Sequence, residues 1–252
     1  MPFVDLEYRA VKPALMLAPF VESFWMLVNP TDVAVPVVLV PDGRVDVLFC
    51  FSAEAPYRVL LLGLQNRPED QVISPYSTMF AISCTLLAVE YLLPAQGGSL
   101  LHDGRELPDD YLGMSAEDLR NFDRFCANAS ARLTHALPNA IDPRKRTLFA
   151  LLYASGGSRS VQALAEAAGW SPREINRYFT RLFGLSLKAY SSILRFRATW
   201  PQLKAGHLYA DGDFADQAHF IREVRKYTGA APKQVARNYD DRFIQFSTLP
   251  EK

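Results

Sequence analysis

SPREINRYFTRLFGLSLKAY (171–190) and DQAHFIREVRKYTGAAPKQV (216–235) carry the same pattern of residue types, 45 residues apart. Each segment begins with a residue whose side chain can cap a helix, Ser171 in the first and Asp216 in the second. Each reaches a glycine thirteen residues later, and glycine can adopt the left-handed conformation that closes a helix. The match predicts one helical unit that occurs twice in the chain.

Between these ends, apolar and basic residues also fall at matching positions. The matching pairs are Ile175 and Phe220, Arg177 and Arg222, Phe179 and Val224, and Arg181 and Lys226. Apolar residues three or four positions apart, with basic residues between them, are typical of an amphipathic helix with a positively charged outer face. Such a face suits a polyanion, because phosphate groups are neutralised by local positive charge.

The sequence before Ser171 completes a helix-turn-helix pattern. Residues 161–168 (VQALAEAA) predict a short helix, and Gly169 predicts a turn. Pro172 then takes the first position of the next helix, where its missing N–H is not needed. A short helix, a tight turn and a second helix with an exposed N-terminal end form a helix-turn-helix, whose second helix fits the DNA major groove.

Three polar residues at the start of that second helix are candidates for reading bases. Arg173, Asn176 and Arg177 lie off its apolar face. An arginine can donate two hydrogen bonds to guanine, and an asparagine can pair with the N6 and N7 edge of adenine. The alternative is that these residues form an ordinary solvated helix face.

The charge distribution separates the two halves of the chain, although the formal net charge of its 252 residues is zero. Residues 1–157 hold 12 Lys and Arg against 18 Asp and Glu, whereas residues 158–252 hold 15 against 9. Only the C-terminal half therefore has the local positive charge that a nucleic-acid partner requires. The alternative is chance segregation of the charges.

The composition and the termini exclude several other classes of protein. With 49% hydrophobic and 21% charged residues, the chain is globular and long enough for two domains. Its three cysteines are widely spaced without a CxxC pair, which indicates neither a disulfide framework nor a zinc ribbon. The N-terminus lacks a secretory signal pattern, and no run approaches 18 uncharged apolar residues. We expect a cytoplasmic protein with no membrane partner.

The first hundred residues predict strands separated by turns. Residues 33–40 and 45–49 flank the turn Pro41-Asp42-Gly43, and together they predict a hairpin. Residues 57–64 and 79–93 are further strand-like runs. The sequence therefore predicts a β-rich barrel or sandwich in this half.

Helices are predicted after the β-rich half. Ser115 can cap a helix whose apolar residues recur every three or four positions as far as Leu137. We expect this helix to pack on its own β-rich domain, and the alternative is that it faces a second subunit. Another helix is predicted at 143–153, and helical structure continues from there to about Tyr239.

The C-terminal residues resemble the AraC/XylS family of transcriptional regulators. The matching residues are Leu164-Ala165, Gly169 before Ser171, Phe179 before Phe183-Gly184, and the block FADQAHF (214–220) with Arg222, Gly229 and Pro232. The resemblance covers about 141–239 and implies a DNA-binding unit with two helix-turn-helix motifs joined by a long helix. It also implies that the two recognition helices enter major-groove segments about one helical turn, roughly 34 Å, apart.

Carried over by position, the resemblance also implies which residues read bases. In the first motif the readers fall on the three polar residues named above. In the second they fall on Gln217, Ala218, Ile221 and Arg222. Only Gln217 and Arg222 of this second set have hydrogen-bonding side chains, so we expect weaker base readout from the second motif.

The chain departs from the family pattern before the second recognition helix. The family has room there for a full supporting helix, whereas this chain has only seven residues between Gly206 and Phe214. Asp213 stands where glycine is usual, and Pro201 interrupts the connecting helix expected from Leu187. We expect the second motif to contribute more to phosphate binding or to packing than to sequence specificity.

The N-terminal half offers weaker signals. Phe24-Trp25 with PDGRVD (41–46) and Phe49 resembles the N-terminal domain of one subgroup of the family, over roughly residues 15–100. Only His102 and His135 occur here, so a metal centre of several histidines is not expected. Aromatic residues of this half can fill the core or line an effector pocket, and the sequence assigns no ligand residues.

Together these features predict an α+β protein. Residues 1–138 are expected to form a β-rich regulatory or dimerisation domain that ends in a helix. Residues 141–252 are expected to form an all-α DNA-binding domain with helix-turn-helix motifs at about 160–190 and 207–235. The predicted function is sequence-specific transcriptional regulation through double-stranded DNA, without catalysis or a cofactor. A small-molecule effector and a second copy of the chain are candidate partners. The alternative is a small-molecule-binding protein or enzyme with an accessory or vestigial helix-turn-helix.

Overall fold

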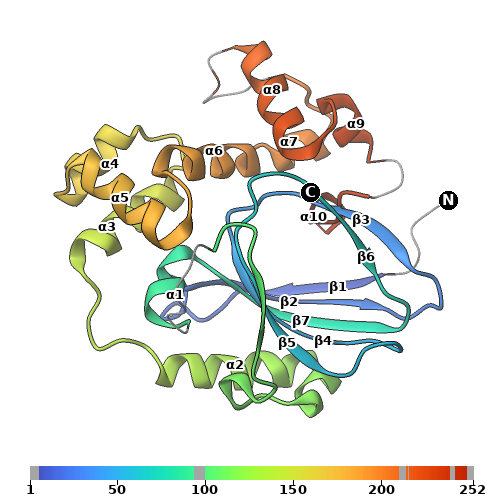
Figure 1. Ribbon diagram of the computed structural model, residues 1–252. Coiled ribbons are helices and arrows are strands. Elements are labelled where there is room, and N and C mark those ends of the chain that lie inside the picture. The colour runs from blue at the N-terminus through green and yellow to red at the C-terminus, as the bar shows by residue number, and fades with distance from the viewer. Residues whose placement is uncertain (1–5, 94–99, 210–213, 215, 239–241, 249–252) are drawn as a thin grey trace.

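A β-rich N-terminal half and a helical C-terminal half make up the protein (Figure 1). The computed structural model describes residues 6–93, 100–209, 214, 216–238 and 242–248. The strands precede the large group of helices in the chain, which confirms the predicted α+β class.

The pairs between the described strands are antiparallel, and most of them join strands that are not consecutive in the chain. The strands are β1 (Glu7–Val11), β2 (Val21–Asn29), β3 (Val35–Leu39), β4 (Val45–Phe51), β5 (Arg58–Leu62), β6 (Glu69–Ile73), β7 (Ser77–Cys84) and β8 (Gly104–Leu107). One sheet has six strands in the order β1-β2-β7-β4-β5-β8, and a separate ribbon pairs β3 with β6. The predicted barrel or sandwich is thus a six-stranded sheet with a two-stranded ribbon beside it.

The predicted hairpin of residues 33–40 and 45–49 is wrong. Strand β3 pairs with β6, whereas β4 pairs with β5 and β7. The turn between them is buried against the helical half, because the Tyr190 hydroxyl donates a hydrogen bond to the Gly43 carbonyl at 2.7 Å. Gly43 has φ +76°, which suits glycine. The chain therefore crosses here from the ribbon to the sheet instead of folding back on itself.

The strand predicted at 79–93 is correct only in its first half. Strand β7 ends at Cys84, and helix α1 (Leu86–Tyr91) follows directly. The residues Leu86, Leu87 and Ala88 are all buried, so the apolar run continues through the change from strand to helix. A short, continuous apolar run does not distinguish a buried strand from a buried helix. Pro94 and Gly97-Gly98, which follow this run and whose residue types favour turns, lie outside the described residues.

The predicted helix from Ser115 to Leu137 is divided at Asn121. A 3₁₀ segment, η2 (Ala116–Arg120), follows the single turn η1 (Tyr111–Gly113) and precedes helix α2 (Phe122–His135). Asn121 has extended backbone angles, and its side chain accepts a hydrogen bond from the Arg124 N–H. Phe122 and Phe125 pack edge-on against Phe80 of β7, so α2 lies on its own sheet as expected.

The helical half begins after a linker and closes back on the β-rich half. Its helices are α3 (Pro143–Ala154), α4 (Val161–Ala168), α5 (Pro172–Phe183), α6 (Leu187–Ala198), α7 (Trp200–Lys204), α8 (Gln217–Thr228), α9 (Pro232–Arg237) and α10 (Ile244–Ser247). Helix α6 runs across the molecule between the group α3–α5 and the group α7–α9 (Figure 1). Helix α10 packs on β3, where the Gln245 side chain bonds both the N–H and the carbonyl of Val40.

The connecting helix ends early, as Pro201 predicts. Helix α6 stops at Ala198, and the five-residue α7 starts at Trp200. His207, Leu208 and Tyr209 are not helical. The rest of the short segment predicted to replace a supporting helix, 210–213, lies outside the described residues.

The two halves share one hydrophobic core. Buried residues of the β-rich half, such as Val45 and Phe49, belong to the same cluster as Leu148, Tyr190 and Phe196 of the helical half. Burial of apolar side chains contributes about 25 cal/mol per Å². The helical half is therefore stabilised by packing on the sheet and is not suspended from a free linker.

Gly157 lies in the connection between α3 and α4, where α6 approaches closely. We therefore expect Gly157→Ala to destabilise the protein strongly. A Cβ at this position would clash with the Ser191 carbonyl and lie 3.0 Å from Leu194 Cβ, at φ +78°. We expect the substitution to lower the free energy of unfolding by about 3 kcal/mol, from the left-handed backbone and the overpacking together. Gly169→Ala is the matched control, because its φ is +66° but no atom lies within 4 Å. Equal losses in thermal unfolding would contradict the close approach.

Candidate nucleic-acid interface

Helices α4 and α5 form the first helix-turn-helix with the predicted ends. Ser171 caps α5, and its Oγ accepts the Glu174 N–H at 3.2 Å while the Glu174 carboxylate accepts the Ser171 N–H and hydroxyl. These hydrogen bonds lower the pKa of Glu174. Gly169 ends α4 and Gly184 ends α5, both in the left-handed conformation. Local caps therefore define both ends of α5.

One side of α5 is packed and the other carries arginines. Ile175, Tyr178, Phe179 and Phe183 are buried. Arg173, Arg177 and Arg181 are exposed and follow one another at intervals of four residues. Residues four apart on a helix lie on the same side, so the three guanidinium groups form a basic row along α5. Within the part of the chain that the structure describes, none of the three has a hydrogen bond or an ion pair closer than 4.0 Å.

Asn176, the remaining candidate on α5, is half-buried and engaged inside the protein. Its Oδ1 accepts a hydrogen bond from the Leu187 N–H at 3.2 Å, at the first turn of α6. This bond ties α5 to α6. To pair with adenine, the Asn176 carbonyl would have to share or release it.

Helix α8 repeats the ends of α5. Asp216 accepts the His219 N–H at 2.6 Å, and Gly229 ends the helix at φ +69°. Arg222 is exposed on its surface. Gln217 is half-buried, and its amide donates a hydrogen bond to the Leu208 carbonyl at 2.8 Å. The two arginines predicted on α5 and the one on α8 thus face solvent, whereas both amide side chains bond to the backbone.

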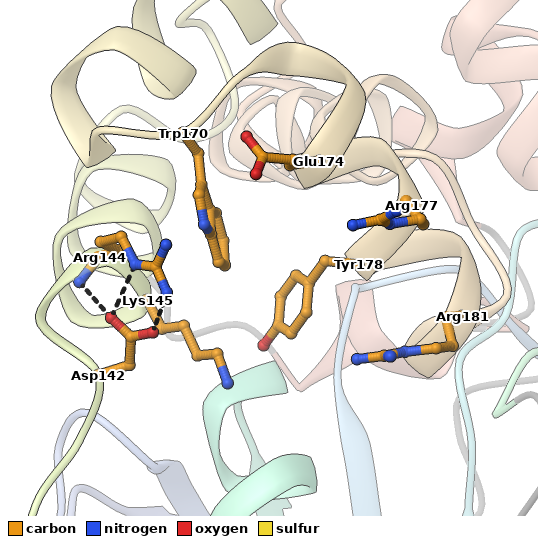
Figure 2. A pocket seen from close by; sticks show the side chains of 8 residues that line it. All are labelled: Asp142, Arg144, Lys145, Trp170, Glu174, Arg177, Tyr178 and Arg181. Carbon is orange, nitrogen blue, oxygen red and sulfur yellow. Dashed lines mark hydrogen bonds and ion pairs between the residues drawn. The ribbon is translucent and has the colours of Figure 1, made fainter.

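A pocket of about 290 Å³ opens between α3 and α5 (Figure 2). We call it the α3–α5 pocket, and its lining residues are Asp142, Arg144, Lys145, Trp170, Glu174, Arg177, Tyr178 and Arg181. Trp170 and Tyr178 form an aromatic wall with ring centroids 5.3 Å apart. Arg144 lies over Trp170 and is held by Asp142 through two side-chain hydrogen bonds.

Beside this pocket, α5 contacts the β-rich half directly. The Tyr178 hydroxyl donates a hydrogen bond to Glu90 of α1 at 2.7 Å, and Lys145 forms an ion pair with the same carboxylate. Lys145 also lies over the rings of Tyr91 and Tyr178. Burial and the Glu90 hydrogen bond raise the pKa of Tyr178. The sequence analysis did not identify this contact, because Glu90 and Tyr178 are 88 residues apart.

A relay of hydrogen bonds forms a second contact between the halves. The Leu86 N–H donates to the Tyr153 hydroxyl, which lies 3.1 Å from the Tyr190 hydroxyl, which in turn donates to Gly43. The relay joins α1, α3, α6 and the turn before β4. It satisfies the first N–H of α1, which the side chain of the N-cap residue Thr85 does not bond.

Ion pairs beside this relay involve the PDGRVD segment. Glu22 of β2 accepts two hydrogen bonds from Arg197 of α6, at 2.7 and 2.8 Å, and also pairs with Arg44. Arg44 is stacked on Tyr153 at 4.9 Å. Burial, followed by the nearby Asp42 carboxylate, raises the pKa of Asp46 to about 7. The segment that resembled a family feature therefore lies where the two halves meet.

The described residues contain no group of three or more His, Cys, Asp or Glu side chains placed to hold a metal ion. Among the helices that the structure describes, none is long and apolar enough to cross a membrane.

The chain is similar to two family models and to solved structures. A family model described as a helix-turn-helix domain matches residues 164–238, and one described as a domain of unknown function (DUF6597) matches residues 9–103. A solved structure of ToxT from Vibrio cholerae is 9% identical, with 95% of this chain and 98% of that chain covered and a TM-score of 0.44. ToxT from Vibrio cholerae O395 is 11% identical, with 92% and 96% covered and a TM-score of 0.39. No curated protein matches the chain.

The matched helix-turn-helix supports a DNA-binding transcription regulator. An AraC-type helix-turn-helix thus occupies the C-terminal region, as the sequence resemblance implies.

Proposed function

We propose that this regulator binds promoter DNA sequence-specifically, with α5 as its principal recognition helix. The observation that carries the proposal is the basic row on α5, whose N-terminal members Arg173 and Arg177 are exposed and unpaired among the described residues. The N-terminal residues of a recognition helix contact base edges, and arginine pairs best with guanine. Arg173 and Arg177 are therefore the proposed base readers of the first motif.

The second motif contributes Arg222 as a base or phosphate contact. Asn176 and Gln217 remain predicted readers, but their hydrogen bonds to Leu187 and Leu208 favour a positioning role. Each bond fixes a recognition helix relative to the segment beside it. Sequence choice is then expected to depend more on the arginines than on the amides.

The β-rich domain is proposed to regulate DNA binding through its contact with α5. The Glu90–Tyr178 hydrogen bond links α1 directly to the recognition helix. A change at α1 therefore reaches the DNA-reading surface without an intermediate element. A small-molecule effector and a second copy of the chain remain candidate partners for such a change.

The test is selection of binding sites from random duplex DNA with the full chain, followed by footprinting. We expect a protected site of about 15 to 20 base pairs, because two major-groove segments one turn apart must be spanned. Arg173→Ala or Arg177→Ala should cost about 1 to 3 kcal/mol at one base position and relax the preference there. Arg159→Ala, which removes an exposed arginine before α4, is the control for charge. Protection without any preferred sequence would contradict the function, and uniform weakening on all sequences would reassign the arginine to phosphate.

A further inference from the structure

We propose that the segment 242–248, which contains α10, is a positioning element for the second helix-turn-helix motif. It anchors α7 and α9, and through them α8, on strand β3 of the β-rich half. Its effect on DNA rests on the proposed function, whereas the anchoring itself is a property of the free protein. The segment gives the second motif the support that α4 gives to α5 in the first.

The first argument is the difference between the two motifs in front of their second helices. In a helix-turn-helix the first helix packs on the second, as α4 packs on α5 here. Before α8, in contrast, the described residues 207–209 and 214 are not helical, and only seven residues separate Gly206 from Phe214. Helix α8 therefore depends more on the elements behind it, which include α6 and α9.

The second argument is the attachment of the segment to β3 and to the residue that follows it. The Val38 N–H donates a hydrogen bond to the Arg242 carbonyl, and Val38 forms a parallel bridge with Phe243. The Gln245 amide donates to the Val40 carbonyl at 3.1 Å and accepts the Val40 N–H at 3.2 Å. A side-chain amide can satisfy both backbone groups of one residue, as a neighbouring strand would. The segment is thus bound to the backbone of the β-rich half.

Ile244 adds an apolar contact to this attachment. It is buried in a small cluster, apart from the main core, whose other buried members are Leu27, Val35, Val37 and Ile73 of β2, β3 and β6. In Figure 1, α10 lies between β3 and the helices α7 and α9. The segment therefore has one side on the strands and the other toward the second motif.

The third argument is a row of aromatic rings that leads from the segment to α8. The Phe246 ring centroid lies 5.3 Å from that of Trp200 in α7, and the Trp200 ring lies 5.9 Å from Phe196 of α6. Phe196 in turn lies 5.1 Å from Tyr227 of α8. All four side chains are buried. Because close-packed interiors transmit displacement, the position of Phe246 bears on that of α8.

Asn238 connects the segment to the end of α9. Its Oδ1 accepts the Phe243 N–H at 3.1 Å, and its Nδ2 donates to the Ser247 hydroxyl at 2.9 Å. Asn238 closes α9 with φ +35°, a left-handed conformation that asparagine tolerates better than most residues. The end of α9 and the segment are therefore held together.

The turn between α8 and α9 is less closely packed on the β-rich half. A cavity of about 170 Å³ lies there, and its lining residues are Val38, Pro68, Asp70, Thr228, Gly229, Ala230, Arg242 and Phe243. Such a gap removes contacts that a closed interface would make. The segment 242–248 is therefore the firmer link between the second motif and the strands.

Gln245→Leu tests the anchor, because it keeps an uncharged side chain of similar size and removes both hydrogen bonds to Val40. The first measurement is backbone hydrogen exchange of the full chain without DNA. We expect the amides of 217–237 to exchange about tenfold faster than in the wild type, and those of α5 to be unchanged. Gln71→Leu is the matched control, since Gln71 is exposed on β6 and its side chain bonds Glu69 of the same strand. Equal acceleration in α5 and α8, or none in α8, would overturn the proposal.

The second measurement compares a duplex that carries the complete selected site with one shortened to the groove segment that Arg177→Ala identifies. The wild type should prefer the complete duplex by about tenfold, because α8 contacts only that one. Gln245→Leu should lose most of this preference and still bind the shortened duplex within about twofold of the wild type.

Phe246→Leu is the second variant, and it covers the case in which Gln245→Leu does not fold. It keeps an apolar side chain and removes the ring contact with Trp200, so it should shift both measurements in the same direction. An undiminished preference for the complete duplex in the folded variants would overturn the positioning role. A wild-type chain that selects no sequence would contradict the proposed function alone, and the exchange measurement would still decide on the anchor.

Discussion

Replacing Glu22 with Gln is expected to lower the free energy of unfolding by about 3 kcal/mol. The substitution keeps the size of the side chain and removes the carboxylate that pairs with both Arg44 and Arg197. The Arg44 side chain is only 9% exposed, so its charge would remain largely buried without this partner. Breaking a buried ion pair on one side costs about 3 to 5 kcal/mol, and the partial exposure of Arg197 places this case at the lower end.

The measurement is urea unfolding of the full chain followed by circular dichroism. Glu117→Gln is the matched control, because Glu117 also pairs with an arginine, Arg120, but both side chains are more than half exposed. Exposed pairs contribute about 0 to 1 kcal/mol, so the control should unfold close to the wild type. Similar urea midpoints for Glu22→Gln and Glu117→Gln would show that the ion pairs of Glu22 with Arg44 and Arg197 do not hold the halves together.

Replacing Phe179 with Ala is expected to destabilise the protein by about 3 to 5 kcal/mol and to abolish specific DNA binding near physiological temperature. The Phe179 ring is fully buried and contacts the rings of Phe149, Phe183 and Tyr190 at centroid distances of 5.9, 5.2 and 5.9 Å. Truncating a buried phenylalanine loses its transfer free energy and leaves a cavity. Because these rings come from α3, α5 and α6, the cavity would release the recognition helix from both neighbours.

Thr180→Ala tests the neighbouring position, which is exposed on the same helix. We expect it to change the free energy of unfolding by less than about 0.5 kcal/mol. Thermal unfolding and binding to the selected site should be measured on the same samples. If Phe179→Ala unfolded and bound DNA like Thr180→Ala, α5 could not be fixed by its packed face as described.

The sequence predicted the first motif well because the signals there are local. Ser171, Pro172 and the glycines after α4 and α5 act within one helical turn of the ends they define. The hairpin at Pro41-Asp42-Gly43 was predicted from signals of the same kind and is wrong. The structure of this turn depends on Tyr190, which is 147 positions from Gly43 in the chain. The Tyr190 hydroxyl donates a hydrogen bond to the Gly43 carbonyl and so holds the turn in the interface between the halves. Strand pairing and the burial of a turn are decided by such distant contacts.

The candidate site, too, was predicted from the sequence only where its features are local. The exposure of the α5 arginines follows from helical periodicity, which the sequence shows. The hydrogen bonds of Asn176 and Gln217 do not, because they depend on where Leu187 and Leu208 lie after folding. The pocket residues Arg144 and Lys145 were visible only as a basic run at the start of α3. Their pairing with Asp142 and Glu90, which leaves Arg177 and Arg181 as the pocket arginines without an ion pair among the described residues, requires the tertiary structure.

The continuous core described above bears on how proteins of this architecture could diversify. Exchange of whole domains between relatives requires a boundary at which few apolar side chains cross. In this chain Tyr190, Phe196 and the β-rich residues Val45 and Phe49 belong to one cluster, so no such boundary separates the sheet from α6. A recombinant that joined this sheet to a foreign helical half would expose mismatched surfaces on both sides. The two halves are therefore expected to change together, by paired substitutions across their shared core.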